Sequence, residues 1–214
     1  MKIKYKLLND ILKPWDELNE RLSMPYCVEP ELSSITKMAT DIATSISHFG
    51  ENSKTEKRED TGKNCSSNQL MIDIADMSKH GTLRNTNREN KINVVSSFEY
   101  IDLSNYIFLR NKIIIEHNTY GESDFMEKSL NAILYWASKL TLNIKRELTI
   151  KNNTQSEKAT LTFNPKYCIH AEKATYNFQK RNESGILVDF DPPRFYIEIL
   201  DMEGKIKAFA DVVL

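Results

Sequence analysis

Cysteine is scarce in this 214-residue chain, which has three: Cys27, Cys65 and Cys168. They are widely spaced, odd in number and never form a CxxC pair, so the sequence predicts neither a disulfide framework nor a zinc knuckle. This pattern favours a reducing compartment, and we expect a cytoplasmic protein. The chain has no apolar run of membrane-spanning length and no apolar signal-peptide core after its basic N-terminus. We therefore expect no association with a membrane.

The chain also lacks an excess of charge of either sign. Its 29 Lys and Arg residues balance 30 Asp and Glu residues, so net charge indicates no general attraction to nucleic acid. P-loop, GxGxxG, GxSxG and HExxH motifs are missing, which leaves nucleotide-dependent phosphoryl transfer, dinucleotide redox chemistry, serine hydrolysis and zinc proteolysis without a motif. We expect no cofactor. Hydrophobic residues make up 40% of the chain and can form a sizeable core.

Helical periodicity dominates the first 144 residues. Apolar residues recur at spacings of three and four on both sides of Pro14, which predicts a short helix before Pro14 and a second from Pro14 to about Ser23. A single kinked helix is the alternative. The segment 51–64 has no apolar residue, and we expect a loop there. Gly50 and Gly81 are expected to end helices in the left-handed conformation. Three further helices are predicted: Pro30–Gly50, Ser66–Gly81 and Ser123–Leu140.

From Lys91 the apolar period becomes alternating, which is typical of strands. A β-hairpin is expected near residues 91–119. After a change of composition at 143–152, alternation predicts five more strands: 158–163, 174–179, 186–190, 195–200 and 206–213. We therefore expect an α+β protein with a helical domain carrying the hairpin over 1–144, and a small antiparallel β-sheet or sandwich over 145–214.

The most apolar stretch of the chain, Asn105–Phe125, also carries Arg110, Asn111 and His117. If this stretch is a helix, Arg110 and His117 lie on nearly the same face, roughly 10 Å apart along the axis. The pattern of Arg110, Asn111 and a following histidine resembles the motif of the HEPN superfamily. The resemblance implies a helical bundle that dimerises and acts as a metal-independent endoribonuclease of a toxin or defence system, with Arg110, Asn111 and His117 as its catalytic residues.

Such residues suit RNA cleavage because a histidine can move a proton near neutral pH, while an arginine stabilises charge on the phosphate. The same stretch also has strong β-propensity on both sides of Asn111 and Lys112, which predicts two strands joined by a turn at these two residues. That arrangement would separate Arg110 from His117 by roughly 13 Å and prevent direct cooperation within one chain. The strand interpretation is favoured, and the helix stays open as the alternative.

A second group of polar residues lies within the helix predicted at Ser66–Gly81. Asp73, Asp76 and His80 are spaced by three and four and therefore line one side of this helix. They could hold a divalent metal ion, although the sequence shows no second set of ligands. The alternative is that Asp76 and His80 form an i, i+4 pair on the solvent side of the helix.

Two strand-rich regions and no strong catalytic motif favour a non-catalytic, cytosolic binding protein. It would recognise a partner protein through its β-rich surface or hairpin. The alternative partner is RNA, cleaved by a HEPN-like homodimer through Arg110, Asn111 and His117. A metal-dependent enzyme at Asp73, Asp76 and His80 is the third hypothesis.

Overall fold

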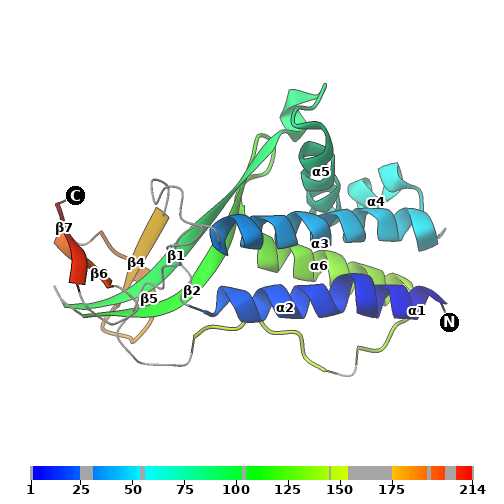
Figure 1. The fold of residues 1–214 in the computed structure, drawn as a ribbon. Coiled ribbons are helices and arrows are strands. Elements are labelled where there is room, and N and C mark those ends of the chain that lie inside the picture. Colours follow the sequence, from blue (N-terminus) through cyan, green and yellow to red (C-terminus); the bar gives the residue numbers. More distant parts are fainter. Residues whose placement is uncertain are drawn as a thin grey trace. The chain divides into compact units, whose positions relative to one another are not determined.

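A computed structural model describes residues 2–24, 31–53, 56–102, 105–144, 146–153, 175–191, 194–200 and 206–213. The protein is an α+β protein (Figure 1). It divides into two compact units. The first unit comprises Met1–Arg21, Ile35–Asn93 and Ile113–Ile150, and the second comprises Leu22–Ser34, Val94–Lys112 and Lys151–Leu214. Each unit is thus assembled from three stretches of chain.

One helical run forms the N-terminus, from α1 (Lys2–Lys6) through a π-helical segment, η1 (Leu7–Leu12), to α2 (Lys13–Leu22). The prediction of two separate helices on either side of Pro14 is wrong, because the helical run continues through Pro14, as in the single-helix alternative. The N–H of Lys13 donates to the carbonyl of Leu8, five residues back, which is the π-helical pattern. Proline has no N–H and its ring crowds the carbonyl four residues back, so a wider turn directly before Pro14 relieves a clash within a continuous helix.

The predicted helices are confirmed as α3 (Glu31–Ser53), α5 (Ser66–His80) and α6 (Phe125–Lys139). Gly81 ends α5 at φ 72°, in the left-handed region that glycine adopts without strain. The carboxylate of Asp124 accepts hydrogen bonds from the N–H groups of Met126 and Glu127 and so caps α6. These helix ends follow from residues that are close in sequence.

The prediction that α3 ends at Gly50 is wrong, because the helix continues to Ser53. A Cβ atom at Gly50 would lie 2.7 Å from Cζ2 of Trp136. Glycine is therefore needed here to let the indole of α6 approach the backbone of α3. The Trp136 side chain is 1% exposed, and its Nε1 donates a hydrogen bond to Oδ1 of Asn68 at 3.0 Å.

The loop predicted at 51–64 is also wrong in part, because α4 (Arg58–Asn64) lies within it. Polar contacts order this segment in place of apolar burial. Glu56 accepts hydrogen bonds from the hydroxyl of Tyr135 and the amide of Asn64, and Thr61 is buried. Burial and the neighbouring Glu56 carboxylate raise the pKa of Tyr135 to about 12. This cluster links α4 to α6 within the first unit.

Five strands form a mixed sheet in the order β3-β2-β1-β4-β5. They are β1 (Asn90–Asp102), β2 (Asn105–His117), β3 (Gly121–Asp124), β4 (Thr175–Arg181) and β5 (Leu187–Asp189). β4 is parallel to β1, whereas β3 is antiparallel to β2 and β5 to β4. A separate antiparallel pair is formed by β6 (Arg194–Leu200) and β7 (Ile206–Val213).

The residues of the hairpin predicted near 91–119 form the strands β1 and β2, which are neighbours in the sheet. Its predicted turn at Asn111 and Lys112 is wrong, as is the helical alternative, because β2 is one strand from Asn105 to His117. The strands predicted at 174–179, 186–190, 195–200 and 206–213 are confirmed, and the one at 158–163 lies outside the described residues. β4 and β5 extend the hairpin's sheet instead of forming an antiparallel sheet of their own.

The buried side of β2 changes along its length. Successive side chains of a strand point to opposite faces. Up to Arg110 the buried side chains are at even-numbered positions, Phe108 and Arg110. After Arg110 the buried side chains are at odd-numbered positions: Asn111, Ile113, Ile115 and His117. The change occurs between Arg110 and Asn111, shortly before the chain leaves the second unit for the first at Lys112 and Ile113. β2 therefore carries polar side chains into the interior of both units.

Candidate functional site

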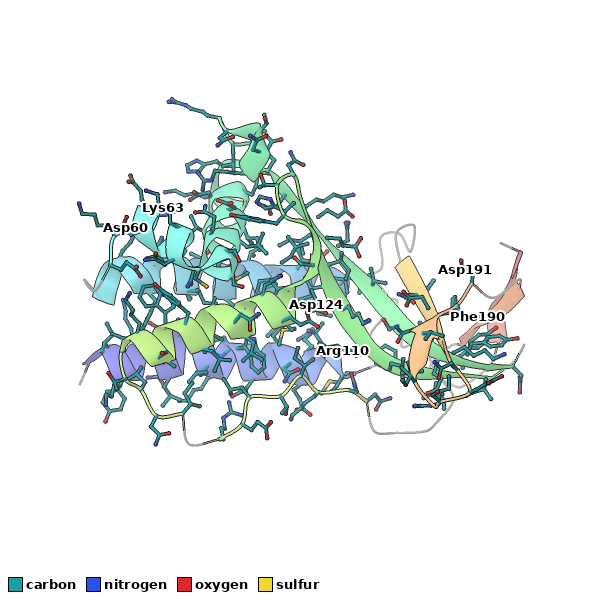
Figure 2. All side chains as sticks on the ribbon, turned by 180° about the vertical axis from the view of Figure 1, so that it is seen from behind. Asp60, Lys63, Arg110, Asp124, Phe190 and Asp191 are labelled. Atoms are coloured by element: carbon teal, nitrogen blue, oxygen red, sulfur yellow. The ribbon has the colours of Figure 1, made fainter. Side chains whose placement is uncertain are left out.

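Arg110 and Asn111 lie on β2 in the second unit, where Figure 2 labels Arg110. Arg110 is 4% exposed; its Nε donates to the carbonyl of Asn111 at 3.1 Å and its Nη1 to the carbonyl of Lys151 at 3.2 Å. Asn111 is fully buried and accepts a hydrogen bond from the hydroxyl of Ser96 at 2.7 Å. Both side chains thus satisfy buried polar groups of their own unit.

His117 lies at the end of β2, in the first unit, with its side chain 1% exposed. Its Nδ1 accepts hydrogen bonds from the backbone N–H groups of Thr119, at 3.0 Å, and Tyr120, at 3.3 Å. A nitrogen that accepts carries no proton, so the proton is on Nε2, which lies 3.1 Å from Oδ2 of Asp73. The hydrogen-bond pattern therefore assigns one neutral tautomer and uses both ring nitrogens.

The structure does not give Arg110 and His117 the common helical face that the HEPN resemblance implies. They lie on one β-strand, with Arg110 in the second unit and His117 in the first. Each side chain makes its contacts within its own unit. A catalytic role for Arg110, Asn111 and His117 stays a prediction.

A charge cluster in the first unit is formed by Arg58, Asp73, Asp76, Arg88 and His117. Asp73 is 1% exposed, and its Oδ1 accepts hydrogen bonds from Nε of Arg88 at 2.6 Å and from the amide of Gln69 at 2.7 Å. Asp76 accepts from Nη2 of Arg88 at 2.7 Å and from Nη2 of Arg58 at 2.6 Å. Arg88 therefore bridges the two carboxylates of α5.

The charge cluster includes Asp73 and Asp76 of the predicted metal site but not its third member. His80 is exposed at the end of α5. The carboxylates are held by two guanidinium groups, which neutralise them and supply charge-assisted hydrogen bonds. In the part of the chain that the structure describes, no group of three or more His, Cys, Asp and Glu side chains is arranged to hold a metal ion.

Backbone contacts fix Arg88 in place beside α5. The short 3₁₀ helix η2 (Thr86–Arg88) precedes β1. The side chain of Asn118 donates to the carbonyl of Thr86 at 2.6 Å, and the hydroxyl of Thr119 donates to the carbonyl of Asn87 at 2.7 Å. The turn after β2 thus holds both η2 and, through its N–H groups, the ring of His117. Sequence reasoning missed Arg88 because it lies in a polar segment, 15 and 12 residues from its two partners.

We expect the charge cluster to stabilise the fold less in acid. Burial raises the pKa of Asp76, but hydrogen bonds from Arg88 and Arg58 outweigh burial, so the pKa is lowered overall. A carboxyl with a lowered folded-state pKa stabilises the fold above the unfolded-state value, about 3.9, and this contribution is lost as pH falls through the folded-state value. The difference in free energy of unfolding between the wild type and Asp76→Asn should therefore shrink from neutral pH to about pH 2. A difference independent of pH, measured by denaturant unfolding, would contradict this.

One face of the sheet in the second unit is rich in aromatic rings. Contacting rings have centroids 4.8 to 5.9 Å apart, and they belong to Phe98, Tyr100, Tyr106, Phe108, Tyr176, Phe178 and Phe190. Phe98, Phe108 and Phe178 are buried, whereas the other rings are half-buried. Lys180 lies over Tyr100 and Phe190, with Nζ 5.9 and 5.4 Å from the two centroids. This apolar face supports β4 and β5.

β5 ends this sheet, and among the described strands none pairs with its outer side. The backbone N–H of Phe190 donates to the carbonyl of Phe178, and the carbonyl of Ile186 accepts from the backbone N–H of Asn182. Residues 186 and 190 therefore direct their backbone groups toward β4. The direction of these groups alternates from one residue to the next along an antiparallel strand. Leu187 and Asp189 therefore direct their N–H and carbonyl groups away from β4, toward the open edge.

The side chains at this edge are apolar and exposed. Ile186 is 62% and Val188 44% exposed. Val188 pairs with Lys180 across the ladder, so it stands on the aromatic face of the sheet. Figure 2 labels Phe190 and Asp191 directly after β5. We call the backbone groups of Leu187 and Asp189, with the side chains of Ile186 and Val188, the β5 edge.

No protein-family model matches the chain, and comparisons with curated proteins and with solved structures find no match. None of the helices in the described ranges is long and apolar enough to cross a membrane.

Proposed function

We propose that this chain is a non-catalytic binding protein that takes up a segment of a partner polypeptide as an added strand beside β5. The observation that carries the proposal is the β5 edge, where outward-directed backbone groups of Leu187 and Asp189 stand beside exposed Ile186 and Val188. Added strands gain affinity from main-chain hydrogen bonds and specificity from alternate side chains. An edge that offers both is suited to this mode of recognition.

The geometry of the three HEPN-like residues also supports a non-catalytic role. Arg110, Asn111 and His117 are each at most 4% exposed and hydrogen-bonded to other parts of the protein. A general base must reach the proton that it removes, and a guanidinium must reach the phosphate. Both would first have to leave these internal hydrogen bonds.

A nuclease assay tests the absence of catalysis. The purified chain, incubated with mixed RNA in EDTA, is expected to leave the RNA intact. His117→Gln is the matched variant, because the glutamine amide can still donate to Asp73 but cannot take part in proton transfer near neutral pH. RNA cleavage by the wild type that disappears in His117→Gln, while both proteins stay folded by circular dichroism, would establish the nuclease instead.

Selection from a displayed library of random peptides tests strand uptake. Peptides that bind the full chain are expected to alternate apolar residues, because alternate side chains of an added strand share one face. Leu187→Pro should abolish their binding, since proline removes an N–H that points to the open edge and leaves the bonds to β4 in place. Leu187→Val is the control. Binding that is equal in the proline variant would refute strand uptake at the β5 edge.

A further inference from the structure

We infer that the polypeptide that occupies the β5 edge is a second copy of this chain, so that two copies of β5 pair antiparallel about Val188. This inference rests on the proposed function, because it uses the same edge. In a two-fold interface, if residue i of one copy contacts residue j of the other, then residue j of the first also contacts residue i of the second. The possible pairings of two β5 strands can therefore be examined from the sequence of the β5 edge alone.

The direction of the backbone groups allows only certain registers. Residues that direct their N–H and carbonyl groups outward must face residues that do the same. In the register centred on Val188, Leu187 of one copy faces Asp189 of the other, and both direct these groups outward. The two copies can therefore exchange a full set of ladder hydrogen bonds while each keeps its bonds to β4.

Two other symmetric registers satisfy the same rule but are less favourable. Centring on Asp189 places two carboxylates directly opposite each other, which is destabilising. Centring on Leu187 brings Gly185 into the ladder opposite Asp189. Gly185 has φ 76° and belongs to the turn before β5, so it cannot continue a strand. The register centred on Val188 avoids both problems.

In the favoured register the side chains on the aromatic face are complementary. Val188 faces Val188 of the second copy, and Ile186 faces Phe190 of the second copy. These side chains include two that the single chain leaves 62% and 44% exposed. Apolar cross-strand pairs stabilise a sheet, and pairing removes an open apolar edge from water. A second copy therefore satisfies both the backbone and the side chains of the β5 edge.

Analytical ultracentrifugation of the full chain over a concentration series tests the inference, and a dimer is expected. Val188→Glu should abolish the dimer, because two carboxylates would then lie opposite each other at the two-fold axis. The same substitution should leave the single chain folded, because Lys180 lies across the ladder from this position. Val188→Thr, which keeps a β-branched side chain, should remain dimeric, and Leu187→Pro should be monomeric.

The outcomes separate this inference from the proposed function. A monomeric wild type, or a dimer that persists in both Val188→Glu and Leu187→Pro, would overturn the inference. If the wild type is monomeric but displayed peptides still bind in a way that Leu187→Pro abolishes, strand uptake stands and only the identity of the strand is wrong. If peptides also fail to bind, both proposals fail.

Discussion

Replacing Asp73 by alanine is expected to lower the free energy of unfolding by about 1–3 kcal/mol, the range for leaving a buried hydrogen-bonding group without its partner. The carboxylate is 1% exposed and accepts hydrogen bonds from Gln69, Arg88 and His117. Its removal leaves three donors without their acceptor, and unpaired buried donors keep their full desolvation cost. Chemical denaturation of the wild type and Asp73→Ala measures the loss.

Asp76→Ala is the matched control, because Asp76 lies on the same helix and shares Arg88 but has a side chain 22% exposed. Water can replace the lost carboxylate there, so a smaller destabilisation is expected. A double-mutant cycle between Asp73→Ala and His117→Ala should show coupling, because residues in one hydrogen-bond network are not additive. A cost below about 1 kcal/mol for Asp73→Ala, or no coupling with His117, would mean that the charge cluster does not stabilise the first unit.

The charge cluster shows which part of a site can be predicted from sequence. The spacing of Asp73 and Asp76 predicted that they share one side of a helix, and they do bind a common group, Arg88. The identity of that group could not be predicted, because Arg88 lies in another element and His117 is 44 residues from Asp73. Helical periodicity describes neighbours on one element and carries no information about which distant side chain packs against it.

Glycine illustrates the same difference between local and distant causes. Gly81 ends α5 through its own backbone conformation, which the sequence predicted. Gly50 lies inside α3, where the reason for glycine is the ring of Trp136 in another helix. A glycine at a helix end and a glycine under a packed ring look alike in sequence.

The alternation of apolar residues in the sequence of β2 indicates that the side chain of His117 is buried. Ile113, Ile115 and His117 follow each other at a period of two, and the structure buries all three. That alternation places the histidine on a core-facing side of the strand. The HEPN-like interpretation of the same residues depends on a helical period, which the β-branched isoleucines disfavour. The period of the neighbouring apolar residues was therefore more informative than the spacing between the polar ones.

Replacing Trp136 by alanine is expected to cost about 3–5 kcal/mol, as for other large aromatic residues removed from a core. The ring is 1% exposed and packs edge-on against Phe49, with centroids 5.7 Å apart. Trp136→Phe should cost less, because it keeps much of the apolar volume and loses mainly the hydrogen bond to Asn68. Denaturant unfolding compares the three proteins. A similar cost for both variants would mean that the hydrogen bond to Asn68, not packing, is the main contribution of Trp136.

The contact between Trp136 and Gly50 makes a further prediction, in which one substitution changes sign with its background. In the wild type, Gly50→Ala places a Cβ atom 2.7 Å from the indole, and such overpacking costs about 1–3 kcal/mol. In the Trp136→Ala background the ring is gone, and alanine should instead stabilise α3 by up to about 1 kcal/mol through its higher helix propensity. The two effects have different physical origins, so their difference isolates the packing of one ring on one backbone position. If Gly50→Ala has the same effect in both backgrounds, the close approach of Trp136 does not explain why glycine occupies position 50 of α3.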